Sequence, residues 1–540
     1  MQLPALSSLL AWVGAVPDAP VEDSHVKNIA IIGAGAAGSS AAYHLQRFAA
    51  EEELAVNITI FEKTDRIGGR TLTADVLDNP TEPIELGASI FVTVNQILYN
   101  ATQDFNLSTA TMREGSPGDL TAIWDGERLV YQSADGESWW REAARLWWRY
   151  GLSPYRAVKL VKSVVGKFMQ LYEEPWFPFR SLTERVVELG LHKITGVTGE
   201  QFLAQNDINP DFSREIIQAA TRVNYASNLA YIHGLEAMVS FATEGAVSVA
   251  GGNWQIFDNM VKHSGAALNK NSTVSAITQD PKKRKGGSSR YRISTKDTTN
   301  LTAEAEDYPV SFDNVILASP WQFSDINADE SVISHAIEEI PYTKLHVTLF
   351  TSPYKLRPGF FGLEDSAKAP SNVYTTLAPS EKALQGAEGV GRSGFYSIST
   401  LRTVTNQQTE KPEFVYKIFS AEPVAASFLS DVLGASVPED FTSGSDESPS
   451  PISWYHPTWF YSYPLELPRV TFQDPVVGDG VYYTSGIEGF ISTMETSALM
   501  GMNVARLIAD EFAGVERTAE GRKKVMEEVV AEEGTAEQEL

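Results

Sequence analysis

Cysteine is absent from all 540 residues of the sequence. This absence excludes disulfides, thiolate metal sites, cysteine nucleophiles and any cofactor attached through cysteine. Long apolar runs are also missing, because no stretch approaches the roughly 20 residues that a membrane-spanning helix needs. We therefore expect no metal site and no transmembrane segment.

Basic residues are scarce relative to acidic ones: 43 Lys and Arg against 69 Asp and Glu give a formal net charge of −26. Such a charge favours solubility and opposes binding to nucleic acid or to anionic lipid headgroups. Hydrophobic residues make up 43% of the chain, which is typical of a globular protein. Because 540 residues exceed the usual size of one domain, we expect two intertwined domains and no nucleic-acid partner.

The N-terminal residues 1–19 combine a modest apolar stretch with small residues and prolines. This pattern favours a secretory signal peptide cleaved near Ala15 or Ala19 over a disordered tail, although no basic side chain precedes the apolar stretch. Glycosylation sequons support passage through a secretory pathway. We therefore expect the secretory pathway, a lysosome or vacuole, or the extracellular space. The sequons are at Asn100, Asn106, Asn271 and Asn300, and a further one at Asn57 is expected to be too enclosed for modification.

A glycine-rich loop follows the first apolar run, Ile29 to Ile32. Gly33 permits a tight turn, Gly35 lets the backbone approach a pyrophosphate, and Gly38 lets a helix pack on a strand. The helix that follows presents free N–H groups and a positive dipole end to the phosphates. A second strand ends at Glu62, which is placed to accept hydrogen bonds from ribose hydroxyls. Strand, loop, helix, strand and acid thus occur in the order that predicts a dinucleotide site.

A second glycine pair then identifies the dinucleotide. The run from Asp65 to Arg70 resembles the extra motif of flavin oxidases in the amine oxidase and GDI superfamily, in which Gly69 brings backbone to the pyrophosphate and Arg70 adds charge. A nicotinamide dehydrogenase has no use for this loop, so we expect FAD. The complete set of expected FAD-binding residues is Gly33, Ala34, Gly35, Ala37, Gly38, Glu62, Lys63, Gly69, Arg70, Gly87, Ala88, Ser89, Val274, Glu488, Thr493 and Met494.

Flavin-type segments return after long interruptions, so the predicted fold is α/β. It combines a Rossmann-like FAD-binding domain of the amine oxidase type with an interleaved α+β substrate domain. Val274, near the start of a strand expected over 272–279, would present its backbone to adenine. A strand ending at Gly486 and a helix beginning near Thr493 would aim a positive dipole at the flavin. We assign 26–91, 249–325 and 468–513 to the FAD domain, 92–248 and 326–467 to the substrate domain, and 514–540 to an acidic tail.

Tryptophans are concentrated in the predicted helices of 139–169, which contain Trp147 and Trp148. Their apolar residues recur at three- and four-residue spacing, as in amphipathic helices. A place in the core is favoured over ligand contact for any one of these aromatics. As a set, we expect them to line a large apolar cavity.

The chain resembles the prenylcysteine oxidase (prenylcysteine lyase) family from Asn28 to about Leu507. The resemblance rests on GAGAAG, IFEK, GGR, RLWWRYGLSPYR, FMQLYE, VAGGN, ILASP, LPR and IEGFISTMETSA, which occur in the same order. His456 and Pro457 stand where the family has a His-Pro pair. Residues 365–450 are only loosely similar, and the cysteines of relatives are absent.

The resemblance implies FAD-dependent oxidation of a prenylated thioether: hydride leaves the prenyl carbon bonded to sulfur, water adds, and the product collapses to cysteine and a prenyl aldehyde. Oxygen then takes the electrons and becomes hydrogen peroxide. No residue is assigned as a catalytic base, since a structural role for His456 is favoured over water activation. Two alternatives stay open: another oxidase of this fold acting on amines or secondary metabolites, and a flavin-free prenyl-binding escort of the GDI type.

Overall fold

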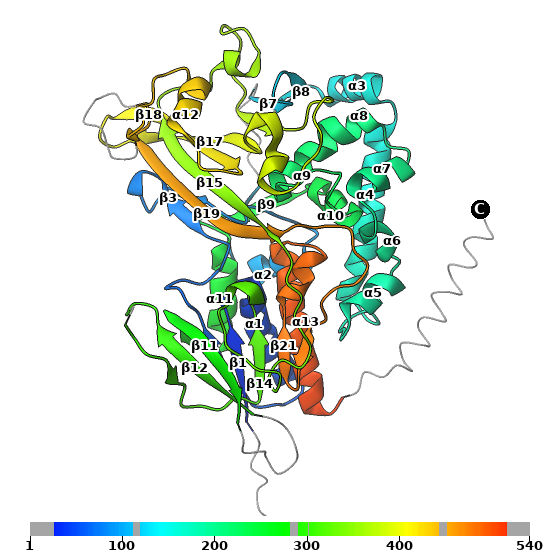
Figure 1. The fold of residues 1–540 in the computed structure, drawn as a ribbon, viewed down its shortest axis with the longest axis vertical. Helices are drawn as coiled ribbons and strands as arrows, with labels where there is room; N and C mark the ends of the chain where they lie inside the picture. Colours follow the sequence, from blue (N-terminus) through cyan, green and yellow to red (C-terminus); the bar gives the residue numbers. More distant parts are fainter. Residues whose placement is uncertain (1–25, 112–118, 281–289, 301, 442–450, 516–540) are drawn as a thin grey trace, which may run out of the picture.

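The computed structural model describes residues 26–111, 119–280, 290–300, 302–441 and 451–515. The expected signal peptide and nearly all of the acidic tail lie outside these residues. The molecule is elongated, with the glycine-loop segment at one end and a large antiparallel sheet at the other (Figure 1).

The end that contains the glycine loop is built on a six-stranded, mostly parallel sheet with the order β10-β2-β1-β14-β21-β20. Its strands read as continuous apolar runs because both faces are covered, one by helices and the other by the strands of 272–297. The strands are β1 (Lys27–Ile32), β2 (Val56–Phe61), β10 (Ala267–Asn269), β14 (Asn314–Leu317), β20 (Val476–Gly478) and β21 (Val481–Tyr483). The sheet thus unites three segments that are hundreds of residues apart in sequence.

Helices pack closely against this sheet. They are α1 (Ala36–Glu51), α2 (Gln96–Asp104), α11 (Trp254–Ser264) and α13 (Met494–Ala513). Contact between α1 and α13 requires glycine at position 501, since a Cβ there would lie 2.1 Å from the carbonyl oxygen of Ala37. The last helix of the described chain therefore packs directly on the helix that follows the phosphate loop.

A seven-stranded sheet, of order β19-β15-β18-β17-β16-β7-β8, forms the other end. Two of its strands come from the 92–248 segment and five from 326–467, so the two segments interleave in one sheet. Helix α12 (Ala426–Leu433) lies beside it (Figure 1). The strands are β7 (Leu120–Trp124), β8 (Leu129–Ala134), β15 (Tyr342–Ser352), β16 (Asn372–Thr375), β17 (Ser397–Asn406), β18 (Lys411–Ser420) and β19 (Trp454–Pro464).

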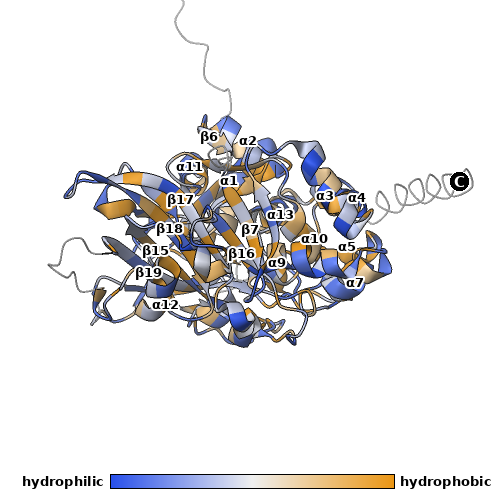
Figure 2. Cartoon of the chain, turned by 90° about the horizontal axis from the view of Figure 1, so that it is seen from above, coloured by the Kyte–Doolittle hydropathy of each residue, from blue (hydrophilic) through white to orange (hydrophobic). Residues whose placement is uncertain are grey.

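Helices from the 139–241 segment form one side of the molecule, and the hydropathy colouring places the most apolar strands and helices toward its middle (Figure 2). The elements are α3 (Trp139–Tyr150), α4 (Ser153–Met169), α5 (Leu182–Glu188), α6 (His192–Thr195), α7 (Gly199–Gln205), α8 (Pro210–Phe212), α9 (Gln218–Tyr225) and α10 (Gly234–Phe241). Within the described residues, no helix is both long enough and apolar enough to cross a bilayer.

Three small sheets complete the fold. They consist of β3 (Thr73–Asp75) with β4 (Pro83–Glu85); of β5 (Phe91–Val92), β9 (Ala246–Val249) and β6 (Thr109–Thr111); and of β11 (Ser272–Gln279), β12 (Tyr291–Asp297) and β13 (Glu306–Asp307). Several short 3-10 turns join the larger elements, among them η4 (Trp321–Phe323) and η8 (Ser485–Gly489).

Local predictions from the sequence agree with the structure where an apolar run is bounded by glycine or a cap. The strand expected over 272–279 is β11, and the helix expected to begin near Thr493 is α13. The expected strand end at Gly486 is wrong: β21 ends at Tyr483, and η8 follows. The prediction that Asn57 is enclosed is also wrong, since its side chain is exposed at the outer end of β2.

The prediction that Trp147 and Trp148 lie in the core or line a cavity is wrong. The side chain of Trp148 is 86% exposed and that of Trp147 is 60% exposed, so neither lies in the core nor lines an interior cavity. Among the residues of α3, only Tyr150 is buried. Helical periodicity correctly predicted an apolar face but not which way that face points.

Candidate active site

The glycine loop joins β1 to α1 in a geometry that only glycine allows at two positions. Gly33 has φ +107°, and a Cβ there would lie 2.9 Å from the carbonyl oxygen of Ala318. A Cβ at Gly38 would lie 2.0 Å from the carbonyl oxygen of Gly33. Gly35 is the N-cap of α1, so the first N–H groups of that helix face the end of the loop. This is the geometry that binds a pyrophosphate at a helix N-terminus.

The second glycine loop lies against the first. The Gly68 N–H donates to the Ala34 carbonyl at 2.9 Å. A Cβ on Gly69 would lie 3.2 Å from the Cα of Gly35. Bare backbone from two segments therefore meets at the N-terminus of α1, which leaves a narrow cradle that a side chain would fill. Ala37 is the second residue of α1; it is buried, its carbonyl faces Gly501 of α13, and its contact with the cofactor stays a prediction.

Glu62 ends the segment after β2 and is 7% exposed. One of its carboxylate oxygens accepts the Ala34 N–H at 2.9 Å, and the other accepts the Thr64 N–H at 2.9 Å. The oxygen that binds the Thr64 N–H also accepts the Thr64 hydroxyl at 2.8 Å, whereas the oxygen that binds the Ala34 N–H keeps a second lone pair. Glu62 therefore fixes the phosphate loop and keeps acceptor capacity for ribose. Lys63, the next residue, is exposed.

Arg70 ties the second loop to distant segments. Its guanidinium lies 2.7 Å from the Glu488 carboxylate and donates to the Ser462 carbonyl at 2.6 Å. Glu488 also accepts the Tyr342 hydroxyl at 3.1 Å. About a third of the Arg70 side chain (34%) stays accessible, whereas Glu488 is buried. Contact of Arg70 with the pyrophosphate stays a prediction, since its charge is already paired with Glu488.

The segment Gly87–Ser89 passes close to this pair, because a Cβ at Gly87 would lie 1.8 Å from the Arg70 carbonyl oxygen. Next to this segment lies a buried pair, Glu85 and Lys417, that the sequence did not predict. Lys417 on β18 donates to the Glu85 carbonyl at 2.7 Å and to the Ser89 hydroxyl at 2.9 Å. The only sequence signal was a lysine in the centre of the apolar run of β18.

Burial shifts both groups of this pair toward neutrality. Desolvation raises the pKa of Glu85 to about 7, against the opposing effects of the Asn253 N–H and Lys417. Desolvation lowers the pKa of Lys417 to about 8. One Glu85 carboxyl oxygen is buried with no hydrogen-bond partner among the described residues. The site therefore holds a carboxyl and an amine that both titrate near neutral pH.

Helix α13 begins where the sequence predicted, and its N-terminus is capped. Thr493 is the N-cap, and its hydroxyl accepts the Thr496 N–H at 3.1 Å. Met494 is the first helical residue, and its sulfur accepts the Thr71 hydroxyl at 3.5 Å, which ties α13 to the second glycine loop. The helix dipole thus points toward the region where the two glycine loops, Glu488 and Arg70 meet.

A second buried acid pair lies at this helix end. Glu236 on α10 accepts the Ser492 N–H at 3.1 Å. Glu466 is fully enclosed, and its carboxylate lies 3.5 Å from His233. His233 accepts the Glu236 N–H through Nδ1, so its proton resides on Nε2 and faces Glu466. Sequence reasoning gave no indication of this cluster.

Desolvation raises the pKa values of both Glu236 and Glu466, and the mutual repulsion of the pair raises that of Glu466 further. Burial lowers the pKa of His233 to about 3, so the imidazole is neutral. Three oxygens of the two carboxyls are buried without a hydrogen-bond partner among the described residues. The cluster therefore retains at least one proton at neutral pH.

The remaining predicted site residues occupy separate positions. Val274 is the third residue of β11, at a β-bulge, and the start of that strand is bonded to the Glu62 segment through the Ser272 N–H. His456 is stacked on Trp454 near the far end of β19. It lies six residues from Ser462, about 20 Å along an extended strand. His456 therefore lies far from the Arg70–Glu488 pair, and its position gives no support to a catalytic role.

These features fit FAD. The two glycine loops leave the space that a pyrophosphate needs, and one oxygen of Glu62 retains acceptor capacity for ribose. The accessible side of Arg70, the backbone of 87–89 and the dipole of α13 offer groups for the ring system. Within the described residues, no cluster of three or more His, Asp or Glu side chains is arranged to hold a metal ion.

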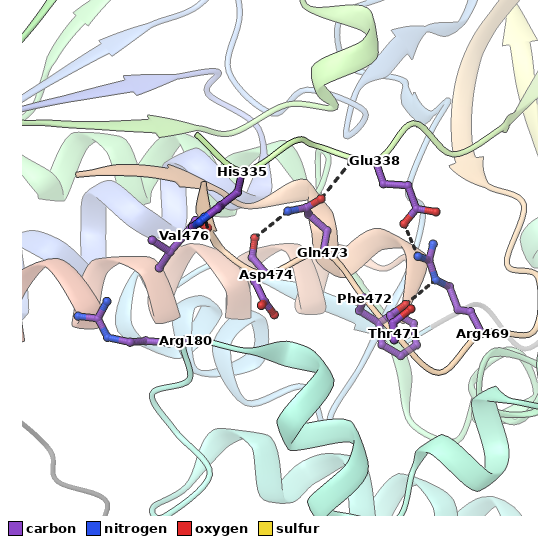
Figure 3. A pocket seen from close by; sticks show the side chains of 9 residues that line it. All are labelled: Arg180, His335, Glu338, Arg469, Thr471, Phe472, Gln473, Asp474 and Val476. Carbon is purple, nitrogen blue, oxygen red and sulfur yellow. Dashed lines mark hydrogen bonds and ion pairs between the residues drawn. The ribbon is translucent and has the colours of Figure 1, made fainter. Parts of the chain in front are cut away.

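A surface cleft elsewhere has a different character (Figure 3). It is lined by Arg180, His335, Glu338, Arg469, Thr471, Phe472, Gln473, Asp474 and Val476. Arg469 pairs with Glu338 there, and the Phe472 ring packs edge-on against Phe490. Its charged lining suits neither a prenyl chain nor a flavin ring, so we do not place the reaction there.

Comparison with known proteins identifies the fold first. The structure superposes on a redesigned putrescine oxidase with a TM-score of 0.52 at 15% identity, covering 90% of this chain and 99% of that one, which shows the fold. Residues 31–105 match the NAD(P)-binding Rossmann-like domain.

Relatives match along nearly the whole chain. Farnesylcysteine lyase of Arabidopsis thaliana is 27% identical over 93% of this chain and 92% of its own length. Prenylcysteine oxidase 1 of Bos taurus is 27% identical over 93% and 91%. The prenylcysteine lyase family model matches residues 133–520, well over half of the chain, so this protein belongs to the prenylcysteine lyase family.

Proposed function

We propose that this protein is an FAD-dependent thioether oxidase that cleaves S-prenylcysteine. The substrate, water and oxygen would give cysteine, a prenyl aldehyde and hydrogen peroxide. A hydride, which carries two electrons, leaves the prenyl carbon, water supplies the aldehyde oxygen, and oxygen accepts the two electrons with two protons to become hydrogen peroxide. Sulfur and the neighbouring double bond both stabilise the cation that this carbon becomes, which makes the hydride unusually easy to remove.

The observation that carries the proposal is the extent of the family match. Residues 133–520 include most of the first segment assigned to the substrate domain and all of the second, so the match does not rest on the glycine loops. The intact cradle formed by Gly35 and Gly69, with Glu62 beside it, argues against a flavin-free prenyl-binding escort. Together they support a flavin enzyme whose substrate pocket is of the prenylcysteine type.

FAD, when bound, supplies hydride acceptance and passes the electrons to oxygen. The chain's own residues bind and orient it. The glycine loops hold the pyrophosphate, and α13 directs its positive end at the ring. Glu488 and Tyr342 hold Arg70 in one orientation, so its accessible face is fixed before substrate arrives.

Aromatic side chains stand beside the Arg70–Glu488 pair and suit a prenyl chain. Phe323 stacks on Tyr461, with ring centroids 4.5 Å apart, and packs edge-on against Tyr342. Tyr463, two residues further along β19, packs edge-on against Tyr225. Burying a 15-carbon chain against such groups would contribute up to about 10 kcal/mol before association costs. A pocket of this kind needs no charged anchor for the prenyl group.

For location, we propose the secretory pathway, with a lysosome, a vacuole or the extracellular space as destination. The exposed side chains of Asn100, Asn106 and Asn300 support this, because each lies in a sequon at the surface. Treatment of protein from a eukaryotic host with a glycosidase should increase its gel mobility. Unchanged mobility, together with peptides that contain unmodified Asn100, Asn106 and Asn300, would argue against the secretory route.

The reaction is tested by incubating the yellow holoprotein with farnesylcysteine and oxygen. The proposal predicts equal amounts of farnesal, cysteine and hydrogen peroxide. Geranylgeranylcysteine, tested alongside, measures the preference for chain length. Peroxide formed from amines but not from either thioether would instead assign the protein to another oxidase of this fold.

A further inference from the structure

Helix α3 leaves a row of large aromatic side chains exposed to solvent. Trp140, Ala144, Trp147 and Trp148 follow the i, i+4, i+7, i+8 spacing of a single helix face, and all four are exposed. The face continues onto α4, where Tyr155 is 70% exposed. We call this surface, made of Trp140, Trp147 and Trp148 with the exposed Leu152, Tyr155 and Val158 that follow in the chain, the tryptophan face.

An aromatic surface of this size does not result from folding alone. Soluble proteins keep large apolar patches where they contact a partner or a membrane. Tryptophan in particular gathers at the boundary between lipid and water, because its ring is apolar and its N–H is polar. The tryptophan face therefore requires an occupant.

The charges around the tryptophan face favour an anionic lipid surface as its occupant. Residues 139–169 contain seven basic residues and one acidic residue, Glu142, in a chain whose net charge is −26. The basic residues are Arg141, Arg145, Arg149, Arg156, Lys159, Lys162 and Lys167. Arg145, Arg149 and Lys162 are paired with acids from outside this segment, so the local basic excess comes from the remaining four residues. The overall charge led us to expect no attraction to anionic headgroups, but this local excess has the opposite sign. A basic surface attracts anionic lipids over a Debye length of about 8 Å at physiological salt.

The arginines flank the tryptophans directly. Arg141, Arg145 and Arg149 form the adjacent stripe of α3, and the Arg141 guanidinium lies 5.3 Å from the Trp140 ring. Arg145 pairs with Glu137 and Arg149 with Glu215. These acids hold the two guanidinium groups in place beside the aromatic rings, and Arg145 and Arg149 remain 42% and 45% exposed.

We infer that the tryptophan face docks this protein on a bilayer surface that contains anionic phospholipid. A second copy of the chain is a poorer occupant, because a two-fold contact would bring two basic surfaces together. The inference rests in one respect on the proposed function, since a prenylated thioether partitions into bilayers. A soluble enzyme docked there would take its substrate from the lipid phase.

The test is flotation of the full-length holoprotein with phosphatidylcholine vesicles, with and without phosphatidylserine, in the absence of substrate. We expect binding to the serine-containing vesicles, weakened by salt. The double variant Trp147→Ser/Trp148→Ser should bind at least about tenfold more weakly. Arg141→Ser/Lys159→Ser should reduce binding to anionic vesicles only. Tyr354→Ser is the matched control, because Tyr354 is 40% exposed on another surface.

Thermal melting and light scattering accompany the flotation. Exposed tryptophans contribute little to stability, so the double variant should melt within a few degrees of the parent. Vesicle binding that is equal in parent and double variant would overturn the inference. Absence of binding by the parent would overturn it as well, as would a parent dimer that the double variant dissociates. Turnover of farnesylcysteine in vesicle-free solution, measured separately, reports on the proposed function and should be unchanged in the double variant.

Discussion

The guanidinium of Arg70 lies 2.7 Å from the carboxylate of Glu488, although the two residues are 418 positions apart in sequence. Arg70 closes the second glycine loop, and Glu488 belongs to the turn before α13. Their ion pair therefore joins the first and last segments of the cofactor-binding part. Because Glu488 is buried, the loss of one partner leaves an uncompensated charge.

A double-mutant cycle tests this junction. Arg70→Met and Glu488→Gln should each lower the free energy of unfolding by about 3 kcal/mol, and the double variant should lose less than the sum. Urea unfolding of the four proteins gives the coupling energy. Additive losses would show that the two side chains do not depend on each other.

The glycine cradle is tested by Gly35→Asp. The new carboxylate would occupy the space of the pyrophosphate and repel it, so the purified protein should be colourless. Gly166→Asp is the control, since position 166 lies on α4 and a Cβ there meets nothing within 4 Å. Absorbance near the flavin bands, measured per protein, decides the outcome. Full flavin content in Gly35→Asp would refute the assignment of the loop.

Glu62→Gln is expected to be milder. The amide retains one oxygen for the Ala34 N–H or for Thr64, but not the charge that strengthens the bonds to ribose. A charge-assisted hydrogen bond contributes about 1.5–3 kcal/mol, which corresponds to roughly ten- to hundredfold weaker FAD binding. Flavin loss on dialysis measures the effect, with the exposed Glu330→Gln as control. An affinity equal to that of the parent would remove Glu62 from the ribose site.

Stability should fall as pH rises from about 6.5 to 8. Desolvation raises the pKa of Glu85 and of Glu495 to about 7, and it also raises the pKa values of Glu236 and Glu466. In this window the folded chain still holds protons that the unfolded chain has lost. Each such proton lowers the free energy of unfolding by about 1.4 kcal/mol for every unit that the pH rises.

Two buried histidines act in the opposite direction at lower pH. Burial lowers the pKa of His44 to about 4 and that of His233 to about 3. The free energy of unfolding therefore decreases through these histidines only as pH drops below about 6.5. Thermal melting at pH 6.5, 7.2 and 8 separates the effects, and Glu466→Gln should flatten the slope. A melting temperature that stays constant or increases over this range would contradict the assignment of protonated buried carboxyls.

The cofactor loops were predictable because their chemistry is local. Gly33, Gly35 and Gly38 are required by backbone contacts within a few residues, and Thr493 caps the helix that begins next to it. The apolar runs of β1, β2 and β14 likewise determine a buried parallel sheet. Such features depend on neighbours in sequence, so spacing alone predicts them.

The missed features depend on partners far away in sequence. Glu85 and Lys417 are 332 residues apart, and Glu236 and Glu466 are 230 apart, so no spacing rule connects them. The orientation of Trp147 and Trp148 was missed for a related reason. Periodicity shows that a helix has an apolar face, but only the packing of the other elements decides whether that face is covered.

The measurement that tests the central claim most directly is product analysis with farnesylcysteine labelled at the carbon bonded to sulfur. The account predicts that FAD-loaded protein converts this carbon into the aldehyde carbon of farnesal, with one cysteine and one hydrogen peroxide formed per oxygen consumed. Gly35→Asp protein should form none of them. Peroxide from an amine panel with intact farnesylcysteine, or farnesal formed by the flavin-free variant, would contradict the account.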